Sequence, residues 1–350
     1  MGEVDLVSQR RFAPTSQGLL RPLSKWLGCP NVSEILINKP HEIYVEKEGQ
    51  LAAFEVKEYD EQTLSMLFQL IANENQQELS AKCPLLSGSL LDGTRVQLVL
   101  PPTAKHHTLS IRRNVVRGLG LEDYKQSDFY KGALPFDISQ CQYESLPGTE
   151  KRLAGLYAAK DWDAFVRLAI ELKKNIVISG GTSSGKTTFL NACLRHMPLS
   201  ERIITLEDTR EIDVPHPNQV NLLASKGGQG EADVSMQDLV QCCLRLRPDR
   251  IIMGEIRGKE IMDFVAASAT GHEGGLTSIH ANSPRIAFMR MVQMYKLNNV
   301  PSMGDEDILK ELKEVVDIIV QVAKTKEGRQ VQSIYYKYGH LAKGHGVGQF

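Results

Sequence analysis

The chain has 350 residues, of which 42% are hydrophobic, and its 41 basic residues nearly balance its 42 acidic ones. This length and apolar content allow about two domains with real cores and exclude an intrinsically disordered chain. The balanced charge excludes a global attraction to nucleic acid or anionic lipid, so direct binding of nucleic acid is not expected.

Residues 15–116 predict a small α+β domain. Apolar and polar residues alternate over 33–56, between turn formers, which predicts short strands. Over 60–77 the apolar residues recur at helical spacing and predict an amphipathic helix. The Asp-Gly turn within 88–102 predicts a hairpin, and 108–113 supplies another strand.

Residues 117–150 contain many glycines and prolines with little periodicity, which predicts a linker between two domains. A helical segment is expected over 150–174, with Trp162 and Phe165 in its core. The glycine-rich residues 339–350 are expected to form a mobile tail.

From 151 to 338 apolar strands alternate with helices, which predicts an α/β domain with a mostly parallel sheet covered on both faces. Ligands bind such sheets beyond the carboxyl ends of the strands. We expect strands over 175–180, 202–208, 250–255 and 275–281, helices over 186–197, 234–248, 258–270 and 307–316, and a hairpin over 317–338.

The stretch "NIVISGGTSSGKTTFLNACL" satisfies the pattern G-x-x-x-x-G-K-[ST] with Gly180, Gly185, Lys186 and Thr187. A loop that wraps a polyphosphate needs glycines, because side chains would hold its backbone N–H groups away from the anion. Lys186 supplies positive charge to the terminal phosphates, and Thr187 offers its hydroxyl to Mg2+. The expected nucleotide contacts are Gly180, Gly181, Thr182, Ser183, Ser184, Gly185, Lys186, Thr187 and Thr188.

Hydrolysis also needs carboxylates, one to hold the metal and another to orient or deprotonate water. The strand in "RIIMGEIRG" ends at Glu255, and "RIITLEDTREID" carries Glu207, Asp208 and Glu211. Two such clusters at adjacent strand ends favour catalysis.

A glycine-rich loop in "TGHEGGLTSIHANS" is followed by a short strand that ends near His280, on the ligand side of the expected sheet. This position suits a sensor of the terminal phosphate. Metal binding by the histidine is not expected, because the sequence shows no Cys or carboxylate at a suitable spacing.

In order, "GGTSSGKT", "TLEDTRE", "MGEIRG" and "TGHEGGLTSIHA" resemble the Walker A, Asp box, Walker B and His box of the secretion ATPases, the hexameric motors of type IV secretion, type II secretion and type IV pili. "GTRVQLVLPP" followed by "TLSIRR" resembles the N-terminal domain of the type IV secretion branch. The linker "GLGLEDYKQSDFYKGALPFD" resembles members whose N-terminal domain is displaced onto a neighbouring subunit. The resemblance covers about residues 15–338 and implies a RecA-like P-loop domain preceded by a smaller α+β domain.

The resemblance also implies roles for single residues. Lys186 and Thr187 match the Walker A lysine and the Mg2+-binding threonine. Glu207 matches a glutamate proposed to activate water, Glu255 the Walker B glutamate near Mg2+, and His280 the His-box histidine. The sequence leaves open which of Glu207 and Glu255 is the general base.

Arg95 and Arg112 match N-terminal-domain arginines that reach the phosphates when that domain closes over the nucleotide. Such arginines neutralise the charge that builds on the transferred phosphoryl group. Whether the domain caps its own site or that of a neighbour stays open, and so do the cargo and the channel component on which the protein docks.

The expected protein is thus a homohexameric, Mg2+-dependent ATPase that energises a type IV secretion or conjugation channel. We expect it in the cytoplasm, peripheral at the inner membrane, in contact with other cytoplasmic ATPases and inner-membrane channel components. Two alternatives remain: a pilus assembly or retraction motor, and a nucleotide-gated ring scaffold that needs little hydrolysis. A type II secretion motor would be expected to carry a four-cysteine zinc insertion, which the sequence lacks.

Overall fold

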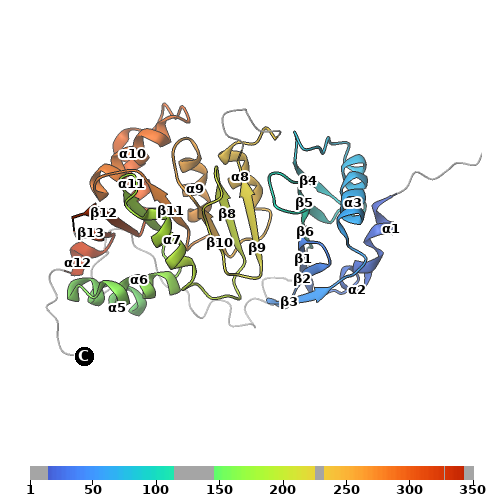
Figure 1. The fold of residues 1–350 in the computed structure, drawn as a ribbon, viewed down its shortest axis with the longest axis horizontal. Helices are drawn as coiled ribbons and strands as arrows, with labels where there is room; N and C mark the ends of the chain where they lie inside the picture. The colour runs from blue at the N-terminus through green and yellow to red at the C-terminus, as the bar shows by residue number, and fades with distance from the viewer. Residues whose placement is uncertain (1–14, 114–145, 225–231, 327, 343–350) are drawn as a thin grey trace, which may run out of the picture. The chain divides into compact units, whose positions relative to one another are not determined.

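The computed structural model describes residues 15–113, 146–224, 232–326 and 328–342 (Figure 1). The chain divides into two compact units, one of residues 1–101 with 106–115 and one of 102–105 with 116–350. Most of the expected linker and most of the expected tail lie outside the described residues.

The first unit is built on a six-stranded antiparallel sheet with the strand order β3-β2-β1-β6-β5-β4. Its predicted helix is α3, which begins after Asp60, whose side chain accepts a hydrogen bond from the Thr63 N–H at 2.7 Å. The predicted apolar face of α3 is confirmed: Leu64, Leu67 and Phe68 are fully buried. The elements are α1 (Ser16–Leu20), η1 (Arg21–Leu23), α2 (Ser24–Leu27), β1 (Val32–Lys39), β2 (Glu42–Lys47), β3 (Gln50–Glu55), α3 (Glu61–Glu74), β4 (Leu85–Ser89), β5 (Arg95–Val99) and β6 (Thr108–Arg112).

The second unit contains a seven-stranded sheet with the order β13-β12-β7-β11-β10-β8-β9. All neighbouring strands in it are parallel except β12 and β13, which confirms the mostly parallel sheet. Strand β9 was not predicted from the sequence. The strands are β7 (Ile176–Gly180), β8 (Ile203–Glu207), β9 (Gln219–Leu223), β10 (Arg250–Met253), β11 (Leu276–Ile279), β12 (Ile318–Thr325) and β13 (Gly328–Tyr336).

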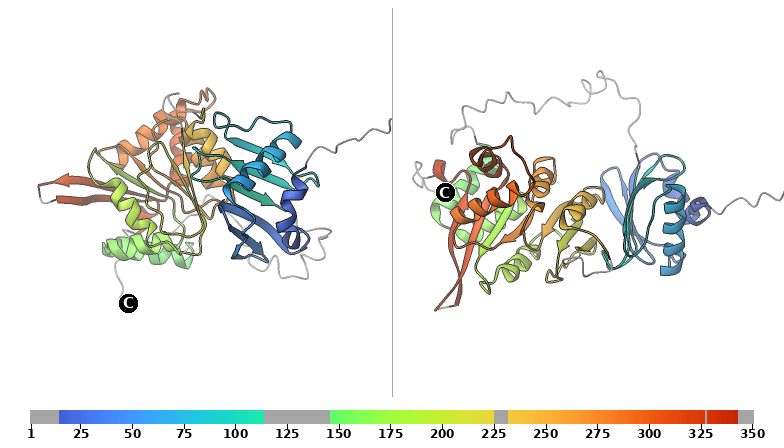
Figure 2. Two further views of the ribbon diagram at one scale, coloured as in Figure 1. Left: turned by 45° about the vertical axis from the view of Figure 1, so that its right-hand side comes forward. Right: turned by 90° about the horizontal axis from the view of Figure 1, so that it is seen from above.

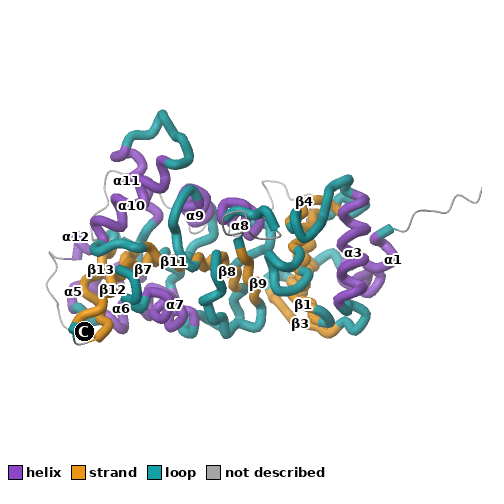
Figure 3. Tube along the Cα trace, turned by 45° about the horizontal axis from the view of Figure 1, so that its top comes forward, coloured by secondary structure: helices purple, strands orange, loops and turns teal. Residues whose placement is uncertain are grey.

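Helices cover both faces of this sheet, with α7 on one face and α8 and α9 on the other (Figure 3). Helix α10 was not predicted. Among the described ranges, no helix combines the length and the apolar character that crossing a bilayer requires. The helices are α5 (Gly148–Ala159), α6 (Trp162–Glu171), α7 (Lys186–Leu194), α8 (Met236–Cys243), α9 (Glu260–Ala269), α10 (Pro284–Lys296), α11 (Asp305–Val315) and α12 (Gly339–Ala342).

Four further details differ from the sequence-based expectation. Helix α5 begins at Gly148, inside the expected linker, and α12 forms the start of the expected tail. The helical segment over 150–174 is divided into α5 and α6, because Lys160 adopts a left-handed conformation (φ 59°) and Asp161 caps a new helix. Phe165 is buried as expected, but Trp162 is 38% exposed, so its assignment to the core was wrong.

Candidate functional site

The loop between β7 and α7 requires glycine at two positions. A Cβ atom on Gly180 would lie 2.6 Å from the Val322 carbonyl oxygen on the neighbouring strand. Gly185 has a φ of +96°, which L residues rarely adopt, and a Cβ atom there would lie 2.8 Å from Cδ of Arg329. The sequence therefore closes the loop tightly at the start of α7, where backbone N–H groups without helical partners can bind an anion.

Lys186 is 8% exposed and lies against the loop that precedes it. Its Nζ donates hydrogen bonds to the carbonyl oxygens of Gly180 (3.2 Å) and Gly181 (3.1 Å) and lies 3.4 Å from the ring nitrogens of His280. Burial lowers the pKa of the Lys186 ammonium, and the nearby Glu255 carboxylate opposes this shift. The ammonium is thus held where the terminal phosphates of a nucleotide bound by this loop would lie.

Hydrogen bonds connect the segment after β8 to α7. The Thr187 hydroxyl donates to Oε2 of Glu211 at 3.2 Å, and the Asn191 amide donates to the Glu211 carbonyl oxygen at 3.1 Å. Asn191 also accepts from the N–H of Asp213 at 3.1 Å. These bonds place the expected Mg2+-binding hydroxyl beside a carboxylate of the predicted Asp box.

Glu207 ends β8 and is 3% exposed. One carboxylate oxygen accepts hydrogen bonds from the N–H groups of Glu211 (2.7 Å) and Ile212 (2.8 Å). Burial raises the pKa of Glu207, and these two hydrogen bonds oppose part of the increase. A carboxylate with a raised pKa is a stronger base than an exposed one, which suits proton abstraction from water.

Glu255 follows β10 and is bound by two basic side chains. Its Oε2 accepts from Nη2 of Arg257 at 2.9 Å, and its Oε1 lies 3.4 Å from Nε2 of His280. Arg257 also forms an ion pair with Asp208, next to Glu207. Burial lowers the pKa of His280, while Glu255 raises it and the cations Lys186 and Arg257 lower it.

These contacts form one line, from Lys186 through His280, Glu255 and Arg257 to Asp208. It runs along the carboxyl ends of four adjacent strands, in the order β7, β11, β10 and β8. The structure therefore brings together residues from all four motifs that the sequence analysis singled out.

Arg95 and Arg112 lie in the first unit, on β5 and β6. Both are exposed, and Nε of Arg112 lies 3.5 Å from a carboxylate oxygen of Glu34 on β1.

A cavity of about 340 Å³ lies beside the loop and includes two residues that sequence reasoning missed, Asn282 and Arg290. Arg290 donates a hydrogen bond to the carbonyl oxygen of His280. Asn282 is part of the quoted His-box stretch and could have been found there. Arg290 lies on α10, and it was missed because this helix was not predicted from the sequence. The cavity is lined by Gly181, Thr182, His280, Ala281, Asn282, Ile286 and Arg290.

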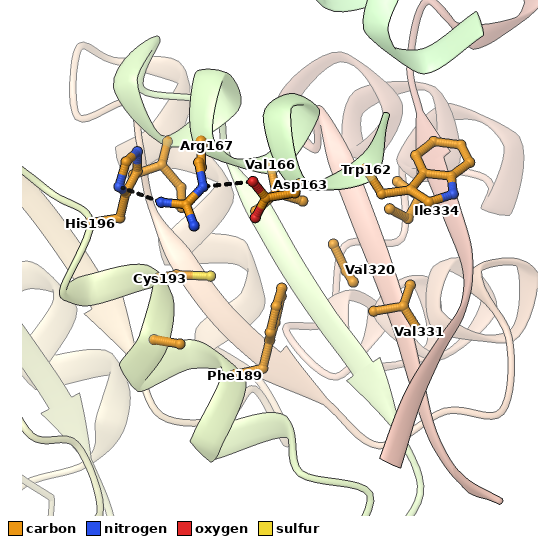
Figure 4. Close-up of a pocket in the computed structure, with 12 residues that line it drawn as sticks. Trp162, Asp163, Val166, Arg167, Phe189, Cys193, His196, Val320, Val331 and Ile334 are labelled. Carbon is orange, nitrogen blue, oxygen red and sulfur yellow. Dashed lines mark hydrogen bonds and ion pairs between the residues drawn. The ribbon is translucent and has the colours of Figure 1, made fainter. Parts of the chain in front are cut away.

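A second groove, of about 270 Å³, lies between α6, α7, β12 and β13 (Figure 4). Its walls are mostly apolar, and at its rim Arg167 contacts Asp163 at 2.9 Å and His196 at 3.5 Å. None of the expected nucleotide contacts lines it. The groove therefore lacks the backbone N–H groups and the lysine with which the glycine loop can contact phosphates.

The described residues contain no group of three or more His, Cys, Asp and Glu side chains arranged to hold a metal ion. Mg2+ in nucleotide sites is held by one or two protein oxygens together with substrate phosphates and water. Thr187, Glu211 and Glu255 offer hard oxygen atoms of this kind near the loop, so the residues present fit that ion.

Comparison with known proteins places these residues in a family. The family model described as "Type II/IV secretion system protein" matches residues 153–336. The chain is 35% identical over 326 residues to the type IV secretion system protein VirB11 of Brucella suis, covering 91% of this chain and 89% of that protein. It is 30% identical over 339 residues to protein VirB11 of Agrobacterium fabrum, covering 96% and 97%.

The crystal structure of the VirB11 ATPase from the Brucella suis type IV secretion system, in complex with sulphate, is similar to this chain with a TM-score of 0.86. The two sequences are 33% identical, and the match covers 94% of this chain and 99% of that one. Because the matches extend over most of the chain and of the relatives, the chain belongs to the type II/IV secretion system protein family and is a type IV secretion ATPase.

Proposed function

We propose that the chain works as a homohexameric, Mg2+-dependent ATPase at the cytoplasmic face of the inner membrane and energises a type IV secretion or conjugation apparatus. The observation that carries this proposal is the line of contacts from Lys186 to Asp208, because it joins the phosphate loop to carboxylates that hydrolysis needs. The similarity to VirB11 proteins supports the assignment of the chain to a type IV secretion apparatus. Other cytoplasmic ATPases and inner-membrane channel components are the partners that this role implies.

In this proposal the loop residues 180–188 bind the nucleotide and Lys186 binds its terminal phosphates. Thr187 and Glu255 would hold Mg2+, and the ion would supply positive charge that stabilises the phosphates during transfer. His280 contacts both Lys186 and Glu255, so it is placed to respond when the terminal phosphate is bound or lost.

We assign the general base to Glu207 rather than to Glu255. Both oxygens of the Glu255 carboxylate already have partners, because Oε2 accepts a hydrogen bond from Arg257 and Oε1 lies 3.4 Å from Nε2 of His280. The Glu207 carboxylate is buried and bonded to backbone N–H groups, and its pKa is raised. Glu207 is therefore the better acceptor for a proton from the attacking water.

Arg95 and Arg112 complete the proposed site from the first unit. Each carries an exposed guanidinium, which can stabilise the charge that develops on the transferred phosphoryl group.

The test combines native mass spectrometry with ATP turnover of the full chain in the presence of Mg2+. We expect hexamers, and we expect Glu207→Gln to lower kcat by at least about 100-fold, the usual contribution of a general base, while ATP still binds. Wild-type turnover by Glu207→Gln would move the base elsewhere. A chain that stays monomeric with every nucleotide would contradict the ring.

A further inference from the structure

Arg329 lies against the phosphate loop, although it is more than 140 residues from it in the sequence. Its Nε donates a hydrogen bond to the carbonyl oxygen of Ser183 at 3.2 Å. Its Cδ approaches Gly185 so closely that a Cβ atom there would lie 2.8 Å away. The side chain thus covers the last part of the loop, just before α7 begins.

The position of Arg329 follows from the sheet. Strand β12 pairs in parallel with β7 up to Val322, which lies opposite Gly180, the last residue of β7. The hairpin of β12 and β13 continues beyond this point and extends past the neighbouring strands (Figure 2, left). Arg329 lies near the start of β13 and pairs with Lys324. The hairpin therefore carries a cation past the edge of the sheet at which the loop begins.

The guanidinium of Arg329 has a free end. The side chain is exposed, and among the residues that the structure describes no carboxylate forms an ion pair with it. Its one hydrogen bond within this part of the chain uses Nε and leaves both Nη groups able to donate. Arginine presents its N–H donors as a planar fork that matches phosphate oxygens.

Arg329 and Lys186 contact different parts of the loop. Lys186 bonds to Gly180 and Gly181 at the beginning of the loop, whereas Arg329 contacts Ser183 and Gly185 near its end. In such loops the lysine reaches the β- and γ-phosphates, and the backbone N–H groups cradle the α- and β-phosphates. We propose that Arg329 is a further nucleotide-binding residue, which contacts the α- and β-phosphates of ATP and ADP.

This inference rests on the proposed function, because it requires a nucleotide in the loop. It predicts that Arg329 stabilises ATP, ADP and the transition state equally, since the α- and β-phosphates are present in all three. Loss of such uniform binding raises KM and leaves kcat unchanged.

The experiment measures ADP and ATP-analogue affinity of the full chain by titration calorimetry, together with steady-state hydrolysis. We expect Arg329→Ala to weaken ADP and the analogue alike, by about tenfold, as for one charge-assisted hydrogen bond. KM should rise by a similar factor while kcat stays within about twofold. Arg329→Lys should recover part of the affinity because it keeps the charge.

Lys324→Ala is the matched control, since Lys324 pairs with Arg329 on the same hairpin and is exposed. It should bind ADP as the wild type does. Unchanged ADP affinity in Arg329→Ala would overturn the inference. So would an affinity loss accompanied by a lower melting temperature without nucleotide, because that result would assign Arg329 a purely structural role. If the wild type binds neither nucleotide, the proposed function itself fails.

Discussion

Arg95 and Arg112 lie directly opposite each other across β5 and β6, as Cα partners in the antiparallel register. Like charges in opposite positions of an antiparallel pair destabilise the sheet. Glu34, on the other side of β6, also pairs with Arg112 in register, and its carboxylate lies 3.5 Å from the guanidinium. Glu34 thus offsets part of the charge of Arg112, whereas Arg95 lies on the far side of Arg112 from this carboxylate.

We expect Arg95→Ala and Arg112→Ala to remove catalysis without unfolding the protein. Arginines that neutralise a transferred phosphoryl group contribute about 10³ or more to the rate, so kcat should fall by about that factor. The free energy of unfolding of Arg95→Ala should stay within about 0.5 kcal/mol of the wild type, because that side chain is exposed. Arg112→Ala should lose more stability, because it removes the guanidinium beside the buried Glu34 carboxylate. Single-turnover hydrolysis and urea unfolding of the same samples test both parts.

The neighbouring Arg113 is the matched control for these two variants. Its Nη1 donates to backbone carbonyl oxygens of Trp26, Cys29 and Val32, so it holds the turn before β1. Arg113→Ala should therefore cost about 1–3 kcal/mol of stability through unsatisfied carbonyl groups and leave kcat of the folded enzyme nearly unchanged. A stable but inactive Arg113→Ala would contradict the assignment of a structural role to Arg113 and of a catalytic role to Arg95 and Arg112.

Gly185→Ala is expected to damage both folding and nucleotide binding. The residue has a φ of +96°, and the new methyl group would meet Arg329 at 2.8 Å. We expect a loss of at least about 1 kcal/mol in unfolding free energy from backbone strain, and a weaker affinity for ADP because the loop must open. Thermal unfolding with and without ADP separates the two effects.

Gly155 provides the comparison for this substitution. It lies within α5, and nothing lies within 4 Å of the position that its Cβ would occupy. Gly155→Ala should therefore stabilise the chain by up to about 1 kcal/mol and leave ADP affinity unchanged. If Gly185→Ala and Gly155→Ala changed the free energy of unfolding and the ADP affinity equally, the loop would not require glycine at position 185.

The parallel sheet and the phosphate loop could be predicted from the sequence because their signals are local. The buried strand β7, the glycines and Lys186 lie within a dozen residues of each other, and the strand ends that carry Glu207 and Glu255 follow apolar runs. Strand β9 was missed although its burial alternates, because it is only five residues long and directly follows a proline-containing stretch. Its pairing with β8 stabilises it, and that pairing is not visible locally.

The contacts of Arg257 and Arg329 could not be predicted for a different reason. Arg257 belongs to the Walker B stretch "MGEIRG", but its contact with Asp208 depends on β10 lying beside β8. Arg329 reaches Ser183 because β12 lies beside β7. Both relationships are set by the order of strands in the sheet, which a motif search does not reveal.

Arg257→Ala should raise the pKa of His280. Arg257 is one of the cations that lower this pKa, while Glu255 raises it, so removing the guanidinium favours the protonated imidazole. The His280 ring signals in an NMR titration, assigned with His280→Gln, should move to a higher midpoint. Arg210→Ala is the control, because Arg210 is not among the groups that shift His280. A lower midpoint in Arg257→Ala would contradict the line of contacts.

The kcat of hydrolysis should fall at acidic pH because Glu207 becomes protonated. Its folded-state pKa is raised by burial, so the ionised base is lost as the pH falls through that raised value, and kcat should fall with it. The stability of the fold depends on the ionisation of Glu207 in the opposite direction: the low pH that lowers kcat favours the folded state. Between the unfolded pKa, about 4.3, and the raised folded value, the native state binds more protons than the unfolded state. The contribution of Glu207 to the free energy of unfolding is therefore fully present below the unfolded pKa. It is lost as the pH rises from the unfolded pKa through the raised folded pKa.

Glu207→Gln removes the buried charge and keeps an oxygen that can accept from the N–H groups of Glu211 and Ile212. We expect the variant to be inactive yet at least as stable as the wild type at pH 7, with the difference in unfolding free energy vanishing below about pH 4, where both proteins are neutral at this position. Urea unfolding at the two pH values measures this difference. A Glu207→Gln protein that is clearly less stable at pH 7 would mean that the carboxylate stabilises the fold as an anion, and its assignment as a base with a raised pKa would fail.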